Sequence, residues 1–406
     1  MGVVNNLSTP HSSHIIDSIL LINYDNKKYD LTAALNKLTI YESMGKSPYQ
    51  HGMLSITDDN ALHLNIPIIG EEWLEVSFKT RLDGGVIGQS TFKKRYKVIS
   101  VKNLSKQKVN ENQLLLLEFV SDAFWKSECN LFSKSYRSFV TSDLVKDLME
   151  TALEIPVDVE PTLYPRDWII PNVTAFDFIA RLADESTSKE NLSSDYKFFE
   201  NIDGWHFKSL YTLAQADFKQ RLNVNIDNRD TYDRLKADRY NKEVHFDLQN
   251  QLHGGLGTTV DELDIIQKRV VRSSCGYDQY RAEFTGMNPE RIYINQDQQY
   301  PTDMYYKLFS GNQAYRSNRD SNMNQRIKRI VNRALMDSSV TTLQIPGNID
   351  LKLGDTVYFD FSFKGVPDHT TAGKYLICSI KHEIGISSYT MTLNIRKDSN
   401  IKGEKI

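Results

Sequence analysis

Two stretches near opposite ends of this chain share one pattern of residues. Each copy holds a strand-like segment that follows a glycine and an acid, then a segment that begins with tyrosine, then a closing apolar segment. These segments are 70–78, 96–101 and 114–120 in the first copy, and 354–361, 375–380 and 389–395 in the second. The motif Leu64–Pro67 and its counterpart Leu343–Pro346 precede the two copies. The repetition predicts two equivalent β-units and therefore two equivalent surfaces, although two unrelated β-meanders would share part of this pattern.

Length and composition limit the classes of protein that the chain can belong to. Its 406 residues predict roughly two to four domains. The net charge is −3, with 49 basic and 52 acidic residues interspersed, which argues against a protein whose main task is to neutralise phosphate. A hydrophobic fraction of 40% with 21 tyrosines and 18 phenylalanines is typical of a folded, β-rich chain.

The cysteines and the first residues bear on compartment and membrane insertion. Cys129, Cys275 and Cys378 are widely spaced and form no C-x-x-C motif, so we expect neither a disulfide framework nor a zinc site, and synthesis in a reducing cytosol. The N-terminal residues lack the basic region of a signal peptide. The longest apolar run, 15–22, is far shorter than the ~20 residues of a membrane helix, so we expect no membrane insertion.

Local patterns predict the elements in the middle of the chain. Apolar residues at a helical period predict a helix over 143–153, with Thr141 or Ser142 as its N-cap. A second helix over 175–185 begins with a sequence that resembles a capping box with Asp177 in place of glutamate. Two strands flank Asp203–Gly204, which is typical of a hairpin with a type I′ turn.

The last third of the chain contains an interruption. The stretch 253–324 is rich in Gly, Asn, Gln, Ser and Asp, which indicates an insertion into a β-unit. Ile327, Val331 and Leu335 then lie on one face of a predicted helix, which we expect to pack against that unit. The basic residues of 326–333 lie mostly off this face, which favours a solvated surface or a subunit contact over binding of phosphate.

The predicted fold class is mainly β with α+β inserts: two homologous small antiparallel β-barrels plus two α+β accessory domains. The predicted parts are a flexible leader at 1–13, a first β-barrel at 14–121, an α+β domain with two helices and a hairpin at 122–219, a second, discontinuous β-barrel at 220–252 and 325–397, an insertion domain at 253–324, and a tail at 398–406.

Strand alternation gives expectations for single residues. Along 73–78 we expect Trp73, Val76 and Phe78 on one face of a strand, with Leu74 and Ser77 on the other. If Phe361 lies in the core, its replacement by alanine should cost about 3 to 5 kcal/mol, whereas a variant that folds but does not assemble would place Phe361 at an interface.

Searches for chemistry give negative results. The segment Gly45–Ser47 resembles the end of a phosphate-binding loop, but its first glycine is replaced by Ile40. The calcium-like segment 223–234 has Asn228 at the glycine position and Arg234 at the last ligand position. The histidines do not cluster. The sequence therefore predicts no catalytic, cofactor-binding or metal-binding residue.

Paired carboxylates are the remaining catalytic candidates. Glycoside hydrolysis needs two carboxyl groups about 5 to 9 Å apart across a cleft, and neighbours in sequence do not indicate this arrangement. Asp58–Asp59 is better interpreted as part of a turn. We interpret Glu71–Glu72 as the solvated entry to a strand.

Two segments carry a resemblance to a known family. They are the closing β-unit, from Leu343–Pro346 through 353–357 to 374–377, and the segment from 169–171 to 178–182, which precedes the hairpin. With this layout, the chain resembles the central hub protein of the baseplate of contractile-tailed bacteriophages from about residue 15 to 397. The second segment is similar to type VI secretion spike proteins, which share this architecture. No needle-like repeat follows the second unit, so we expect the spike to be a separate polypeptide.

The resemblance implies a structural, non-enzymatic virion protein, made in the host cytoplasm and located in the tail baseplate. It implies tail-tube-like barrels and a homotrimer that forms a ring of six lobes, joins a three-fold spike to a six-fold tail tube and encloses a DNA channel. The implied partners are the tail spike protein, the tail tube protein, and baseplate wedge and other hub proteins. DNA passes without specific binding and no cofactor is implied. The alternatives are a cell-wall carbohydrate-binding or peptidoglycan-hydrolase tail protein, and a spike component of a type VI secretion or related injection system.

Overall fold

The computed structural model describes most of the chain. The described residues are 14–45, 47–58, 68–81, 87–104, 113–223, 234–237, 239–244, 257–264, 268–291, 304–309, 319–363 and 366–402. The predicted leader 1–13, the first motif Leu64–Pro67 and part of the calcium-like segment lie outside them. Within them, no helix is both long and apolar enough to span a bilayer.

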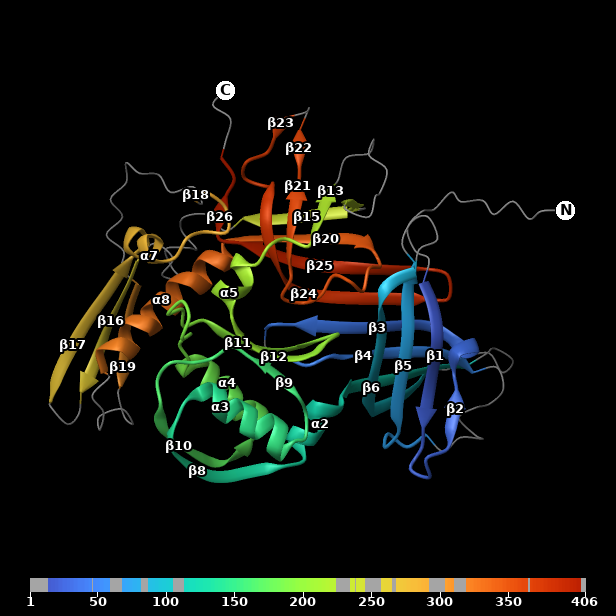
Figure 1. Ribbon diagram of the computed structural model, residues 1–406. Helices are drawn as coiled ribbons and strands as arrows, with labels where there is room; N and C mark the ends of the chain where they lie inside the picture. Colours follow the sequence, from blue (N-terminus) through green and yellow to red (C-terminus); the bar gives the residue numbers. More distant parts are fainter. Residues whose placement is uncertain are drawn as a thin grey trace.

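A set of antiparallel strands forms the N-terminal part, drawn in blue and teal in Figure 1. The strands are β1 (His14–Ile22), β2 (Lys28–Asp30), β3 (Leu35–Ser43), β4 (His51–Asp58), β5 (Trp73–Arg81), β6 (Ile87–Leu104) and β7 (Gln113–Ser121), with the 3-10 helix η1 (Thr32–Ala34) before β3. Hydrogen-bonded neighbours follow the order β2-β1-β5-β6-β7-β4-β3. We call these strands the first strand set.

The second strand set comes mostly from the C-terminal part of the chain. Its strands are β13 (Gln220–Asn223), β14 (Arg234–Lys236), β15 (Arg239–Val244), β20 (Ser339–Pro346), β21 (Thr356–Asp360), β24 (Gly373–Gly385) and β25 (Tyr389–Lys397). The order β13-β21-β24-β25-β20-β15 matches the order β1-β5-β6-β7-β4-β3 strand for strand. The pairing of β6 with β7 has a β-bulge at Ile99, and the pairing of β24 with β25 has one at the equivalent residue, Cys378. The repeat noted in the sequence is therefore present in the strand pairing.

The two sets differ at one end. β1 runs antiparallel to β5, whereas β13 runs parallel to β21 and to β14. The prediction of purely antiparallel units is therefore wrong at this edge. Parallel neighbours need a long crossover connection, and here the chain leaves β15 for the insertion before it returns to β20 and β21.

The strand sets join edge to edge. β3 pairs antiparallel with β24, from Lys37 opposite Gly385 to Ser43 opposite Ser379, so that 14 strands form one sheet. One hydrophobic cluster contains buried side chains of both sets, and the rings of Phe78 and Tyr389 meet across the join at 5.6 Å. We call the β3–β24 pair with its flanking strands the seam.

Alternation along β5 differs from the prediction in one respect. Leu74, Val76 and Phe78 point into the core, while Trp73 and Ser77 lie on the outer face. Trp73 and Leu74 had been assigned to the wrong faces, because side chains alternate strictly with a period of two and Trp73 must share a face with Ser77. On the outer face, the guanidinium of Arg95 lies 4.3 Å from the Trp73 ring centroid.

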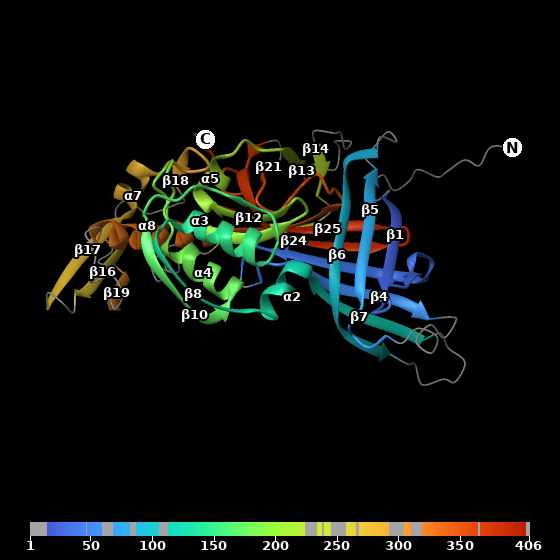
Figure 2. The ribbon, with the colours of Figure 1, turned by 60° about the horizontal axis from the view of Figure 1, so that its bottom comes forward.

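An α+β region follows the first strand set and has a hydrophobic cluster of its own. Its elements are α2 (Asp122–Glu128), β8 (Leu131–Phe139), α3 (Thr141–Lys146), the π-helical turn η2 (Asp147–Ala152), β9 (Val157–Val159), β10 (Arg166–Thr174), α4 (Ala175–Glu185), β11 (Tyr196–Asn201), β12 (Gly204–Ser209) and α5 (Leu210–Gln215). Figure 2 shows α3 and α4 beside the β8–β10 ribbon.

Both predicted helices of this region are present, with different accuracy at their starts. α4 has the predicted bounds, and its N-cap Thr174 accepts a hydrogen bond from the amide of Asp177. α3 begins at Thr141 after the uncapped residue Val140, so the prediction of Thr141 or Ser142 as N-cap is wrong. The Thr141 hydroxyl instead donates to Thr162, which lies far along the chain.

The hairpin is confirmed, but its turn is not type I′. Ile202 and Asp203 form the two-residue loop, and neither has a positive φ. Gly204 follows them as the first residue of β12, with φ of 134°. The amide of Asp203 donates to the side chain of Asn201, so an Asx turn stabilises the loop that a type I′ turn was expected to form.

The insertion contributes a three-stranded sheet, at the far left of both ribbon views, and a short helix, and a long helix leads from it back to the second strand set. Its elements are β16 (Gly257–Asp264), β17 (Arg269–Gly276), α7 (Tyr277–Glu283), β18 (Glu290–Arg291), β19 (Met304–Phe309) and α8 (Arg319–Asp337). Ile327, Val331 and Leu335 of α8 pack with aromatic residues of α7. We expected the apolar face of this helix to pack against the second β-unit. α8 does contact β20 and β25, and its Met336 belongs to the core cluster of the strand sets, but the three residues above face the insertion instead.

The chain ends in small strand pairs. β22 (Ser362–Phe363) pairs with β23 (Val366–Pro367), and β26 (Ser399–Asn400) pairs with β18 of the insertion. Phe359 in β21 is fully buried, whereas Phe361, which follows that strand, is only partly buried, so Phe361 does not meet the condition for the loss expected of a core residue.

Lys397 at the end of β25 is fully buried, and a variant at this position measures what its buried charge costs in stability. Burial, followed by repulsion from Lys242, lowers the pKa of Lys397 from 10.5 to about 7. Its ammonium group donates to the carbonyl of Ala372 at 3.0 Å. Because the folded pKa lies below the unfolded one, the stability cost of the charge grows as pH falls from 10.5 to about 7 and then stays constant.

We therefore expect Lys397→Met to raise the free energy of unfolding by about 2 kcal/mol at pH 6, since replacing a buried charge by an apolar side chain is often stabilising. The difference from the wild type should shrink steadily between pH 7 and pH 9.5. Urea unfolding at three pH values measures it, and a difference that is independent of pH would contradict the assignment.

Candidate functional site

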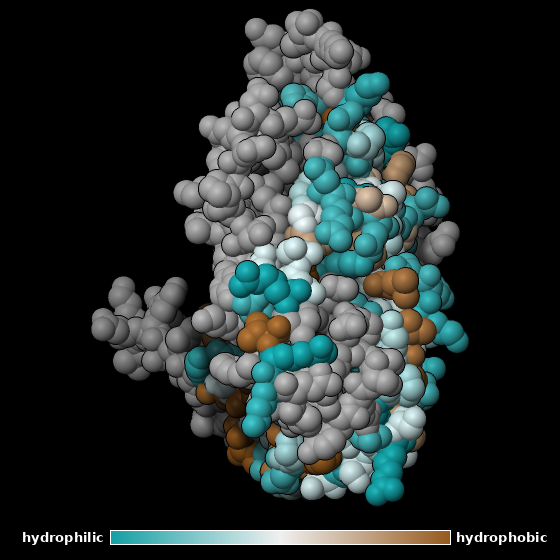
Figure 3. Space-filling view, turned by 90° about the vertical axis from the view of Figure 1, so that its left-hand side faces the viewer, coloured by the Kyte–Doolittle hydropathy of each residue, from teal (hydrophilic) through white to brown (hydrophobic). Residues whose placement is uncertain are grey.

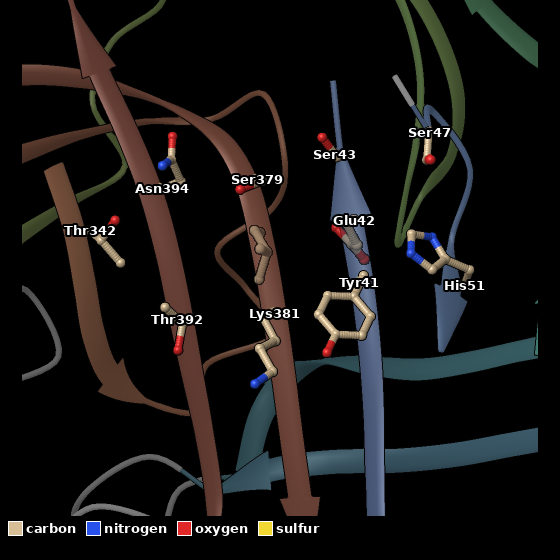
Figure 4. A pocket seen from close by; sticks show the side chains of 11 residues that line it. Tyr41, Glu42, Ser43, Ser47, His51, Thr342, Ser379, Lys381, Thr392 and Asn394 are labelled. Carbon is tan, nitrogen blue, oxygen red and sulfur yellow. The ribbon is translucent and has the colours of Figure 1, made fainter. Parts of the chain in front are cut away.

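The outward face of the sheet holds an open groove at the seam. Its volume is about 510 Å³. The lining residues come from both strand sets and are Tyr41, Glu42, Ser43, Ser47, His51, Thr342, Ser379, Ile380, Lys381, Thr392 and Asn394. Figure 4 shows the side chains of β3 and β24 side by side, with those of β20 and β25 on one flank and His51 on the other. The groove exists only because the two sets pair.

Polar, mutually compensated side chains give this face its character. The carboxylate of Glu383 contacts the ammonium groups of Lys37 at 2.5 Å and Lys381 at 3.1 Å. These contacts, with that of Lys37 first, lower the pKa of Glu383. In the first strand set, Lys102 does the same for Glu118 at 2.5 Å. The face therefore carries charges of both signs in close pairs, with hydroxyl groups between them.

A buried polar chain lies beneath the groove. The side-chain amide of Gln50 donates to Glu42 at 2.6 Å and accepts from the hydroxyl of Tyr96 at 2.9 Å. On the other side of the seam, the ring of His382 shares a hydrogen bond of 2.8 Å with the hydroxyl of Tyr389. Across the seam, the ring of His382 lies 3.6 Å from the carboxylate of Glu42, so the buried polar groups of the two sets adjoin each other. Loss of one partner from such a buried contact leaves a polar group without water.

The described residues of this face provide a surface for contact. The His382–Tyr389 pair is buried, so no substrate reaches it. Glu72 is also buried and accepts from the amides of Ile69 and Gly70, which corrects its interpretation as a solvated residue. Within the part of the chain that the structure describes, no three His, Cys, Asp or Glu side chains gather in a way that could hold a metal ion.

The basic residues of α8 have partners within the chain. Lys328 forms an ion pair with Glu283 of α7, and Arg329 and Arg333 both contact Asp184 at the end of α4. The expectation of a solvated stripe or subunit contact is therefore wrong for these three residues, because they fasten the insertion to the α+β region.

On the side of the insertion, the described apolar side chains lie in small groups. Figure 3 shows that face with small, separate hydrophobic groups among hydrophilic residues. The exposed apolar side chains of the described residues include Ile169 in β10, Val270 in β17 and Ile386 in the turn after β24. Single exposed apolar residues of this kind are normal on protein surfaces.

Comparison with known proteins shows what the chain is similar to. No protein-family model matches the chain. Over 429 aligned positions it is 19% identical to the probable baseplate hub protein gp334 of Vibrio phage KVP40, and the alignment covers 96% of this chain and 97% of that protein. The chain is a homologue of a phage baseplate hub protein. The predicted resemblance is confirmed, and as a hub homologue the protein is a virion tail component.

Solved structures share the fold of this hub homologue. A tail protein from Neisseria meningitidis MC58 matches with a TM-score of 0.59 and 12% identity, covering 94% of this chain and 96% of that one. The 43 kDa tail protein of prophage MuSo2 from Shewanella oneidensis gives the same score and identity and covers 94% and 98%. A chain of the Francisella PdpA–VgrG complex matches with a TM-score of 0.52 and 11% identity, covering 99% of this chain and 55% of that one.

Sequence reasoning missed the groove itself. The alternation of polar and apolar residues along 379–384 and 38–43 shows that both strands have a polar face. It does not show that the two strands are neighbours, since they lie more than 300 positions apart. The seam had no signal in the sequence that a single chain could reveal.

Proposed function

We propose that the protein is the structural hub of a contractile phage tail baseplate, without enzymatic activity. The observation that carries the proposal is the match to a baseplate hub protein along nearly the whole of both chains. The duplicated strand sets support it, since they give each subunit two similar lobes in one continuous sheet.

A homotrimer follows from the duplication as the proposed assembly. Three chains with two lobes each form a ring of six similar lobes, which can contact a six-fold tail tube on one side and a three-fold spike on the other. The proposed partners are therefore a tail tube protein, a spike protein on a separate chain, and the wedge and other hub proteins of the baseplate.

The outward sheet face around the seam is the proposed lining of the channel through this ring. Its charges are paired within the chain, as in the contacts of Glu383 with Lys37 and Lys381. A lining with compensated charges offers little net attraction for phosphate, so DNA passes during ejection without being held.

Light scattering and negative-stain electron microscopy of the purified protein, alone and with the candidate spike, test this proposal. The expected result is a particle of about 140 kDa, three times the subunit mass of 46.8 kDa, with six lobes and three-fold symmetry. Monomers in both samples, at concentrations well above the micromolar range, would reject the trimeric hub.

A further inference from the structure

A second cavity of about 210 Å³ lies beside the groove, where both strand sets meet the α+β region and α8. Its lining residues are Ser43, Met44, Gly45, Lys197, Leu210, Arg333, Met336, Asp337, Cys378, Ser379, Asn394 and Arg396. They come from six different elements. Ser43, Ser379 and Asn394 line both cavities, so the smaller one adjoins the open sheet face.

The lining has an excess of positive charge. Lys197 of β11, Arg333 of α8 and Arg396 of β25 face one carboxylate of the lining, Asp337. That carboxylate forms an ion pair with Arg396. Arg396 also donates its Nε to the side-chain oxygen of Asn394 at 3.3 Å. The other two cations, Lys197 and Arg333, therefore have no carboxylate partner among the lining residues.

Those two cations also have unused hydrogen-bond donors. The Nε of Arg333 is buried and has no hydrogen-bond partner in the described part of the chain, although its Nη2 contacts Asp184 at 3.1 Å outside the lining. The ammonium group of half-buried Lys197 makes no hydrogen bond or ion pair with any described residue. Donors of this kind are costly to bury unless an acceptor is supplied.

Titration behaviour agrees with this geometry. Burial, and then repulsion from Arg333, lowers the pKa of Lys197 to about 8, although the carboxylates of Asp195 and Asp184 oppose the shift. Burial likewise lowers the pKa of Arg396. Burial raises the pKa of the Cys378 thiol to about 12, so this group is neutral and adds no negative charge to the cavity.

We propose that this cavity binds a phosphate-type oxyanion between Lys197 and Arg333. A tetrahedral oxyanion offers acceptors in several directions, which suits an ammonium group and a guanidinium on different elements with the serine hydroxyls between them. The volume holds such an ion together with several waters, since a water occupies about 30 Å³ in the liquid.

The first strand set offers no equivalent site. Asn394 in the lining pairs with Ser379, and the corresponding pair of the first set joins Ser100 to Glu118. A carboxylate therefore stands where the second set has an amide, and it is neutralised by Lys102. The proposed site lies where the second strand set meets β3, the α+β region and α8, so each chain carries one and a trimer would carry three.

Thermal unfolding of the full chain in sulfate and in chloride, at equal ionic strength, tests the proposal. Sulfate keeps its charge between pH 6 and pH 9 and serves as the probe. We expect sulfate to raise the midpoint of the wild type by about 1 to 3 °C at pH 7. Lys197→Gln should lose this shift and Lys197→Arg should keep it. Lys189→Gln, at an exposed lysine, is the matched control and should behave as the wild type.

The pH dependence gives a second reading. Because Lys197 loses its charge near pH 8, the sulfate shift should fall between pH 7 and pH 9 in the wild type and persist in Lys197→Arg. A sulfate shift of equal size in the wild type and Lys197→Gln would reject the site, and so would the absence of any shift in the wild type.

The phosphate group can come from free phosphate or from the DNA backbone, and the same assay separates the two. Inorganic phosphate should reproduce the sulfate shift. A short DNA duplex that raises the midpoint of the wild type but not that of Lys197→Gln assigns the site to the backbone. A duplex without effect assigns it to free phosphate.

Discussion

Replacing Asp398 by alanine is expected to lower the free energy of unfolding by about 3 to 5 kcal/mol. Asp398 follows β25, is almost fully buried, and accepts hydrogen bonds from the guanidinium of Arg281 at 2.9 Å and from the amide of Met287 at 2.9 Å. The alanine variant leaves the mostly buried Arg281 without its counter-charge. It also removes an ion pair between the insertion and the end of the chain.

Urea unfolding followed by tryptophan fluorescence measures this loss. The matched control is Asp203→Ala, which removes a carboxylate that is half exposed and pairs with Lys352 at 2.7 Å. An exposed pair is worth about 0 to 1 kcal/mol, so the control should stay close to the wild type. The double variant Arg281→Met with Asp398→Ala should recover part of the stability, since it leaves no unpaired buried charge. Equal losses in Asp398→Ala and the control would contradict this account.

Features that depend on neighbours in sequence were predictable. The helix α4 has its predicted bounds because its cap, Thr174, and its apolar face lie within one short segment. The two strands beside Gly204 were predictable for the same reason, although the turn type was not. The predicted cap of α3 was wrong because the Thr141 hydroxyl donates to Thr162, a partner that no local pattern reveals.

Features that depend on distant pairing were not predictable from one sequence. A strand's alternation assigns its two faces but not its neighbours, so the repeat pointed to two similar units without showing that β3 and β24 join them. The groove and the adjoining cavity both depend on this join. In the sequence, Lys197 has the pattern of an ordinary strand residue. Its proposed role in anion binding rests on its place in the cavity with Arg333 and Arg396.

Replacing Phe359 by alanine is expected to cost about 3 to 5 kcal/mol of unfolding free energy, because a fully buried aromatic side chain leaves a cavity in the core that both strand sets share. Its ring lies 6.3 Å from that of Tyr375, edge to face, in the interior of the second set. The loss should therefore affect the whole molecule, with one cooperative transition at a lower urea concentration.

Phe361→Ala is the matched control, two residues further along the chain. Phe361 is only partly buried and lies 5.0 Å from the exposed ring of Tyr240, at the margin of the cluster. Its truncation removes less apolar contact and leaves a space that solvent can fill, so we expect a loss of about 1 kcal/mol. Residues 359 and 361 would share a face in a continuous strand, so the end of β21 at Asp360 is the physical reason for the contrast. A larger loss for Phe361→Ala than for Phe359→Ala would show that the core extends beyond the end of that strand.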